Sequence, residues 1–230
     1  MAFFALADLH LGFAVDKPMD MFGERWRNHS EKINENWRKT VTDDDIVLVP
    51  GDISWALKLD EVRQDFDFLA QLPGRKVLIR GNHDYWWDSI SKVREILPPG
   101  MFALQNDHLV FDGVAVCGAR GWNLPVQNDQ DYERDKRIFL RERNRLALSL
   151  QSAPADLPKI AMLHYPPCYH HQEEVGFCDI LEKFKVELCV FGHLHGEDHR
   201  LALRGRHNNV NYVFCAADAV DFTPVRIDTA

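Results

Sequence analysis

Residues 77–87 read VLIRGNHDYWW and combine an apolar run with an abrupt group of polar side chains. The run has the branched apolar residues of a buried strand, and Asn82, His83 and Asp84 follow almost at once. Amide, imidazole and carboxylate groups at the end of a buried strand cost free energy unless something binds them. This stretch therefore predicts a strand that leads directly into a ligand-binding site.

The apolar runs along the chain indicate the fold class. Runs with the length of strands occupy residues 2–8, 45–52, 76–82, 108–111, 114–119, 159–164, 186–193 and 210–217. Helices are expected at about 24–40, 58–72 and 87–97, and Asp112-Gly113 predicts a tight hairpin. The longer runs are apolar on both faces, as in strands covered on two sides. The order begins β-α-β-α-β and then gains antiparallel strands, which predicts an α/β fold with mixed sheets.

Length and charge limit the classes of protein and partner. The 230 residues, 46% hydrophobic and 27% charged, suit one domain over 1–230, with a helical insertion at about 120–155. The net charge of −8 argues against broad nucleic-acid binding, which depends on many cationic contacts with phosphates. A small phosphorylated substrate held by metal ions remains compatible with this charge. No apolar run approaches the roughly 18–20 residues that span a membrane, so no membrane association is expected.

The cysteines and the first residues bear on location. The five cysteines are odd in number and form no CxxC pair, which favours buried thiols and a cytoplasmic, reducing location. The opening residues MAFFALADLH lack a basic segment and a cleavage site, and they are interpreted as a first strand rather than a signal peptide.

Polar residues follow five of the predicted strands. They are Asp8 and His10, then Asp52, then Asn82 with His83 and Asp84, then His164, and finally His193 and His195. Open α/β sheets place ligand sites at the carboxyl ends of their strands. Residues two apart on an extended chain point to the same side. Asp8 and His10 are therefore expected to reach one ion together, and His193 and His195 to flank a pair of ions.

The residue types in this set indicate a metal centre. Carboxylate, amide and imidazole ligands without cysteine fit Mn²⁺, Fe or Zn²⁺ better than a structural thiolate site. Six or seven ligands exceed the needs of one tetrahedral ion, whereas two ions about 3.5–4 Å apart with a bridging carboxylate use them all. Each short motif alone is equally compatible with a turn or a core histidine. The ordered set of five motifs is what indicates the metals.

The same ordered set resembles the calcineurin-like metallophosphoesterase superfamily over about residues 5–196. The longer phrases PGDISWAL and RGNHDYWW are similar to a subgroup of bacterial predicted phosphohydrolases. The resemblance implies a four-layer α-β-β-α sandwich of two mixed sheets flanked by helices, with a dinuclear centre at the strand ends. After Asp52 the chain reads Ile-Ser-Trp-Ala instead of a continuation to Asp-Arg-Gly. The substrates of the protein phosphatase and dinucleotide-tetraphosphate branches are therefore not carried over.

The resemblance also implies roles for individual residues. The first metal would be held by Asp8, His10 and His195, the second by Asn82, His164 and His193, and both by Asp52. The expected ions are Mn²⁺ first, with Fe, Zn²⁺ or Ni²⁺ as alternatives. His83 matches a catalytic histidine that is not a ligand, and Asp84 matches a carboxylate that orients it and raises its pKa.

These observations predict a phosphoesterase that hydrolyses a phosphodiester or phosphomonoester with a hydroxide bridging two ions. The competing class is a non-catalytic metal-binding interaction protein that retains the phosphoesterase fold. A metal-free nucleotide-binding module lacks support, because no GxGxxG or P-loop follows a strand. The physiological substrate and the oligomeric state stay open.

Four lesser signals remain, and the first two have two interpretations each. The arginine-rich segment 131–145 is either a solvated helix or a lid that meets outer phosphates of a substrate. Tryptophans 86, 87 and 122 either stack on a substrate or anchor the core. A zinc site would require unusual spacing among Cys168, His170, His171 and Cys178. The remaining histidines belong to no motif, so they are expected at the surface: His29, His108, His199 and His207.

Overall fold

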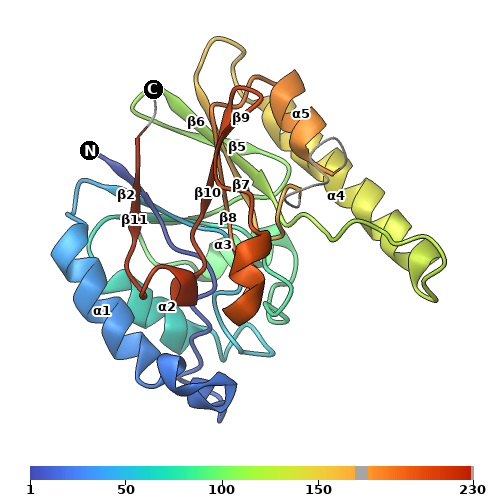
Figure 1. Cartoon of the computed structure of the whole chain (residues 1–230). Coiled ribbons are helices and arrows are strands. Elements are labelled where there is room, and N and C mark those ends of the chain that lie inside the picture. Colours follow the sequence, from blue (N-terminus) through green and yellow to red (C-terminus); the bar gives the residue numbers. More distant parts are fainter. Residues whose placement is uncertain (169–175, 229–230) are drawn as a thin grey trace.

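The computed structural model of the protein describes residues 1–168 and 176–228 (Figure 1). The strands are β1 (Phe3–Ala5), β2 (Ile46–Val49), β3 (Arg75–Leu78), β4 (Met101–Ala103), β5 (His108–Phe111), β6 (Val114–Ala119), β7 (Lys159–Leu163), β8 (Leu188–Phe191), β9 (Gly205–His207), β10 (Val210–Phe214) and β11 (Val225–Ile227). The α-helices are α1 (His29–Thr40), α2 (Arg63–Ala70), α3 (Ile90–Ile96), α4 (Tyr132–Ser152) and α5 (Cys178–Lys183). Short 3₁₀ turns span Met19–Phe22, Glu24–Trp26, Gly196–Leu201 and Ala217–Ala219.

The strands form two mixed sheets. The first has five strands in the order β11-β1-β2-β3-β4, parallel except for β11. The second has six strands in the order β5-β6-β7-β8-β10-β9, with only the outer strands β5 and β9 antiparallel. Phe111 pairs with Val114 around a two-residue turn in which Asp112 and Gly113 both have positive φ, as the hairpin prediction requires.

Alternating side chains in the strands separate the apolar core into layers. Ile46 and Leu48 of β2 face the second sheet and meet residues such as Ile160, whereas Val47 and Val49 face α1 and α2. This period of two is what a strand covered on both faces requires. On the far side of the second sheet, buried side chains of β6, β7 and β8 pack on α4 and α5. Figure 1 shows α1 and α2 on one side of the molecule and α4 and α5 on the other. The predicted four-layer α-β-β-α sandwich is confirmed.

The structure differs from the predicted elements in several places. The helix expected at 24–40 begins only at His29, because Asn28 has a left-handed backbone with φ of 53° that a continuous helix cannot contain. Strands β4, β9 and β11 and helix α5 were not predicted. Each of these strands is only three residues long, so its hydrophobic pattern is too short to read.

Helix α4 lies within the segment 120–155 that was expected as an insertion. Its residues Phe139, Leu146 and Leu150 are buried against the second sheet, so this part of the helix belongs to the outer layer. Within the described residues, no helix has the length and apolar character needed to cross a membrane.

Candidate metal centre

Loops after five strands bring the seven predicted ligands together. Asp8 and His10 follow β1, Asp52 follows β2 and Asn82 follows β3 in the first sheet, while His164 follows β7 and the pair His193 and His195 follows β8 in the second. All seven are buried or half-buried. The centre therefore lies where the carboxyl ends of strands from both sheets meet, as in other open α/β folds.

The backbone at four of these seven residues is not extended. Asp8, His10, Asp52 and His193 have φ of 59°, 46°, 51° and 75°, which is the left-handed region that non-glycine residues seldom adopt. Asp8 and His10 do come together as expected, but the reason given for it, the alternation of side chains along an extended chain, is wrong. Tight turns of the backbone bring the two side chains together. Such strained conformations cost on the order of 1–3 kcal/mol each and cluster at functional sites.

Two glycines make room for the carboxylates. A Cβ atom on Gly81 would overlap Asp52, and one on Gly192 would overlap the carboxylate of Asp8. Neither position has the positive φ that would explain glycine by backbone conformation. The two glycines are therefore required by the close approach of the site itself.

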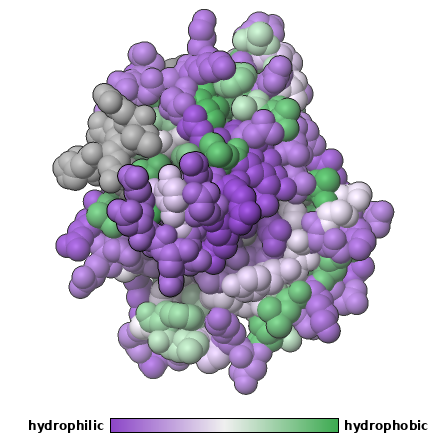
Figure 2. All heavy atoms as spheres, turned by 90° about the vertical axis from the view of Figure 1, so that its right-hand side faces the viewer, coloured by the Kyte–Doolittle hydropathy of each residue, from purple (hydrophilic) through white to green (hydrophobic). Residues whose placement is uncertain are grey.

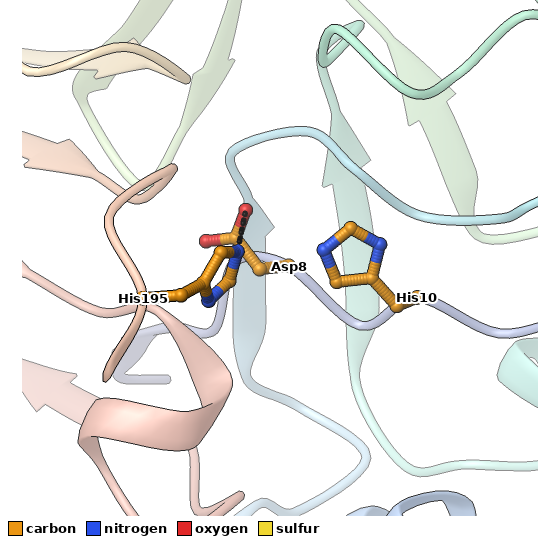
Figure 3. Close-up of side chains that lie close together, drawn as sticks. All are labelled: Asp8, His10 and His195. Carbon is orange, nitrogen blue, oxygen red and sulfur yellow. Dashed lines mark ion pairs between the residues drawn. The ribbon is translucent and has the colours of Figure 1, made fainter. Parts of the chain in front are cut away.

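The first cluster consists of Asp8, His10 and His195, whose ligand atoms all lie within 4.8 Å of one another (Figure 3). His195 Nε2 is 3.8 Å from Asp8 Oδ1, and Figure 3 marks this pair with a dashed line. Asp8 is fully buried, and its Oδ1 has no hydrogen-bond partner in the part of the chain that the structure describes. A buried carboxylate oxygen that accepts no hydrogen bond is costly, so a cation at this point would stabilise it.

The second cluster is formed by Asn82, His164 and His193. Asn82 Oδ1 is 2.6 Å from His164 Nε2 and 2.9 Å from His193 Nδ1, and the two ring nitrogens are 3.2 Å apart. Burial lowers the pKa of His164 to about 3 and that of His193 to about 2. Both rings are therefore neutral at pH 7, which is the form that binds a metal.

Asp52 lies between the clusters. Its Oδ2 is 3.7 Å from His10 Nε2, while its Oδ1 is 3.6 Å from His164 Nε2. Burial raises the pKa of Asp52, and burial also raises that of Asp8, to which the nearby Asp52 adds a smaller rise. The donor set and these buried carboxylates fit divalent cations.

Hydrogen bonds behind the clusters orient two of the rings. His164 Nδ1 is 3.0 Å from the carbonyl oxygen of Pro50, so it acts as the donor and leaves Nε2 free to accept a metal. His195 Nδ1 is 2.8 Å from Asp218 Oδ1, and its Nε2 points to Asp8. Burial lowers the pKa of His195, but Asp218 and Asp8 outweigh it and raise this pKa to about 9. A carboxylate behind a ligating histidine is a common support of metal sites.

Asp218 was missed by the sequence interpretation. It follows β10, which was predicted, but a single Asp after two alanines forms no recognisable motif. Two histidines expected at the surface also lie here. His199 Nε2 is 3.0 Å from Asp218 Oδ2, and His29 Nε2 is 3.1 Å from the carbonyl oxygen of His10. That expectation was wrong for both.

The predicted contact between Asp84 and His83 is not found; Asp84 bonds to other groups. Its Oδ1 accepts hydrogen bonds from the backbone of Ile53 at 2.9 Å and Ser54 at 3.2 Å, and its Oδ2 accepts one from Gly81 at 2.7 Å. The indole of Trp86 donates a further bond to Oδ1 at 3.1 Å. Asp84 thus ties the loop after β2 to the loop after β3, because both offer amide donors to one buried carboxylate.

His83 lies against other groups. Its Nε2 is 4.0 Å from Asp52 Oδ2, and its ring centroid is 4.5 Å from that of Trp55. Its Nδ1 has no hydrogen-bond partner among the described residues. Burial lowers the pKa of His83, with Asp52 opposing, so the expected rise caused by Asp84 is not found.

The tryptophans divide between core and site. Trp86 and Trp87 are buried in the core beside α2 and α3, which supports the anchoring interpretation for both. Trp122 packs on Tyr165, whose ring centroid lies 4.0 Å from that of His193. Trp122 is therefore linked to the second cluster only through Tyr165.

Four of the five arginines of α4 have carboxylate partners. Arg143 forms two hydrogen bonds with the carboxylate of Asp179, at 2.8 and 2.6 Å, and Arg145 Nη1 lies 2.9 Å from Glu142 Oε1. Figure 2 shows that the face carrying α4 is predominantly hydrophilic. These contacts favour a solvated helix over a lid.

The separate zinc site is only partly within the described residues. His170 and His171 lie outside them, whereas Cys168 and Cys178 are buried. A hydrogen bond with Cys168 lowers the pKa of Cys178, and burial opposes this shift. The hydrogen bond means that the two thiols lie close together.

A family model described as calcineurin-like phosphoesterase matches residues 1–197. The chain therefore belongs to the calcineurin-like phosphoesterase family, whose members use divalent metals, and the predicted resemblance is confirmed.

Two solved structures are similar to this chain. The phosphopantetheinyl hydrolase PptH of Mycobacterium tuberculosis matches with a TM-score of 0.60 and 14% identity, over 100% of this chain and 96% of that one. A protein of unknown function from Aquifex aeolicus matches with a TM-score of 0.55 and 14% identity, over 98% and 95%. At this identity the likeness concerns the fold. No curated protein matches the chain.

Proposed function

We propose that the protein is a dinuclear metallophosphoesterase that hydrolyses a phosphomonoester or phosphodiester of a small substrate. The observation that carries this proposal is the position of Asp52, whose two oxygens face different clusters, 3.7 Å from His10 and 3.6 Å from His164. A carboxylate shared by two groups of ligands is the arrangement that holds two ions about 3.5–4 Å apart.

In this proposal Asp8, His10 and His195 hold one ion, and Asn82, His164 and His193 hold the other. Mn²⁺ is the first choice, with Fe, Zn²⁺ or Ni²⁺ as alternatives, because the donors are oxygen and imidazole nitrogen. Two such ions would lower the pKa of a bound water to about 7 and withdraw charge from phosphoryl oxygens, which supplies nucleophile and electrophile at neutral pH.

His83 is the proposed catalytic residue. Its side chain is 36% exposed, so it is accessible to a substrate, whereas the carboxylate of Asp52 beside it is buried. Its Nδ1 has no partner within the described chain, and its Nε2 lies near the bridging carboxylate. From this position the ring can donate a hydrogen bond to a phosphoryl oxygen or a proton to the leaving oxygen. Such a contribution is typically worth 10²–10⁴ in rate.

We further propose a reducing compartment such as the cytoplasm, because the five cysteines are odd in number and form no CxxC pair. The net charge of −8 supports a small phosphorylated substrate rather than nucleic acid in bulk.

The test is metal content together with turnover. Protein dialysed against Mn²⁺ should hold about two ions per chain and hydrolyse bis-p-nitrophenyl phosphate or p-nitrophenyl phosphate, and the ratio of the two rates separates diesterase from monoesterase. Chelation should abolish turnover, and Mn²⁺ should restore it. Bound ions without turnover of either ester would favour the competing class, a non-catalytic interaction protein. Absence of bound metal would contradict both.

A further inference from the structure

A cavity of about 590 Å³ opens directly over the first cluster. His10, His83 and His195 form one side of it. This volume lies in the range of pockets that enclose small organic ligands. Because these three side chains surround the point where phosphoryl chemistry is proposed, the rest of the cavity faces the organic part of a substrate.

A second wall of the cavity, which adjoins these histidines, is mainly apolar, although it also includes Arg25. It comes from the segment between β1 and α1 and from the loop after β2, and it includes Met19, Phe22, Trp26 and Trp55. The ring of Trp55 stacks on His10, with centroids 4.8 Å apart and planes 19° apart. The ring of Phe22 is nearly parallel to that of Trp55, at 8° and 6.2 Å between centroids.

Phe22 has little structural role of its own. Its side chain is 54% exposed, whereas Trp26 and Trp55 are 5% and 8% exposed and belong to the core. A large exposed aromatic side chain at the mouth of a functional cavity indicates a surface for an apolar ligand.

Lys17 supplies a cation on the same wall. Its Nζ is 3.3 Å from the ring centroid of Trp55 and 5.8 Å from that of Phe22. Across the described chain, Lys17 forms no ion pair with a carboxylate, and the acid that lines the cavity, Asp218, is already bonded to His195. Cation–π contact holds the ammonium in place and leaves its charge free for an anion.

We propose that this cavity binds the organic group of the substrate, that this group is planar and apolar, and that Lys17 binds an oxygen of the phosphoryl group. The inference deepens the proposed phosphoesterase function and rests on it. The substrate class is thus a phosphate ester of a ring-bearing, apolar alcohol. The exposed ring of Phe22 accounts for the planar apolar group, and Lys17 accounts for the anion beside it.

The test compares two ligands that are not hydrolysed, phenylphosphonate and methylphosphonate, by calorimetric titration of the Mn²⁺-loaded protein. Their head groups are the same, so a difference in affinity reports on the organic group. Phenylphosphonate should bind about tenfold more tightly (about 1.4 kcal/mol), because partial burial of an aromatic ring contributes this much. Equal affinities, or no detectable binding of phenylphosphonate, would overturn the inference.

Two variants with matched controls assign the contacts. Phe22→Ala should reduce the preference for phenyl to about threefold or less and leave methylphosphonate affinity unchanged. Met21→Ala, a 67% exposed neighbour that does not line the cavity, should change neither. Lys17→Gln should weaken both phosphonates about fivefold while the preference remains. Lys39→Gln, at an exposed lysine paired with Glu35, is its control. An unchanged preference in Phe22→Ala would refute the assignment.

This measurement is separable from the test of catalysis, because calorimetry needs no turnover. Ester hydrolysis together with equal phosphonate affinities would refute the cavity assignment alone. A phenyl preference that depends on Phe22, in a protein that hydrolyses no ester, would refute the proposed activity and leave the cavity assignment standing.

Discussion

His195 Nδ1 lies 2.8 Å from Asp218 Oδ1, which fixes the His195 ring so that Nε2 faces Asp8. Asp218 is almost completely buried and also accepts a hydrogen bond from the backbone of Gly196 at 3.2 Å. The pair connects the segment after β10, next to the edge strand β9 of the second sheet, to the first cluster. Orientation of the proposed ligand His195 therefore depends on a residue outside the predicted ligand set.

Replacing Asp218 should weaken metal binding without removing a ligand. In Asp218→Ala the His195 ring loses its acceptor, and Mn²⁺ affinity should fall about 10–100-fold, as is usual when such a support is removed. In Asp218→Asn the Mn²⁺ affinity should fall less, because the amide oxygen still accepts the hydrogen bond from His195. Equilibrium dialysis measures the effect, and Asp221→Asn, at an 88% exposed carboxylate, is the control. Unchanged affinity in Asp218→Ala would contradict this role.

Replacing Asp84 should loosen two loops at once. The buried carboxylate accepts bonds from the backbone of Ile53, Ser54 and Gly81, so Asp84→Asn places an amide N–H against some of these donors. We expect a loss of about 2–4 kcal/mol of stability, measured by denaturant unfolding. Asp88→Asn, at an exposed carboxylate, should change little. If Asp84 served only to orient His83, stability would be retained and turnover alone would fall.

Lys76 gives a pH-dependent prediction away from the site. It is 3% exposed at the start of β3, and burial lowers its pKa to about 8. The unfolded chain then binds more protons between pH 8 and about 10.5, so this group makes stability rise with pH across that window. Lys76→Met should be more stable than the parent by about 1–3 kcal/mol at pH 7, with the gain disappearing near pH 10.5. A gain that does not change with pH would contradict the assignment.

His83 and Asp52 should separate chemistry from metal binding. His83→Ala should retain both ions and lose about 10²–10⁴ in turnover, because the proposed role of its ring is to contact the substrate rather than to bind metal. Asp52→Ala should lose metal, because both clusters share its carboxylate. Elemental analysis and turnover of the same preparations measure the two effects. Equal metal loss in both variants would count against this division of roles.

Much of the fold was readable from local patterns. Strands β2, β6 and β7 are buried on both faces, so continuous runs of apolar residues were enough to predict them. The site could be assembled because each polar group directly follows a strand, and strand ends of parallel sheets converge.

Other features depend on contacts that no local pattern contains. The bond between His195 and Asp218 joins residues 23 apart in sequence and exists because β10 pairs with β8. The sequence predicted that Asp84 orients its neighbour His83. Instead, its carboxylate accepts hydrogen bonds from the amides of Ile53 and Ser54, which follow another strand. Aspartate adopts the left-handed backbone found at Asp8 and Asp52 more readily than most residues, but no sequence pattern marks these positions for it.

The most direct test of the central claim is anomalous diffraction from crystals grown with Mn²⁺. The account predicts two manganese peaks about 3.5–4 Å apart, with one oxygen of Asp52 directed at each and Asn82 on only one of them. A single peak, or density away from Asp52, would contradict the proposal that the two clusters form one dinuclear centre.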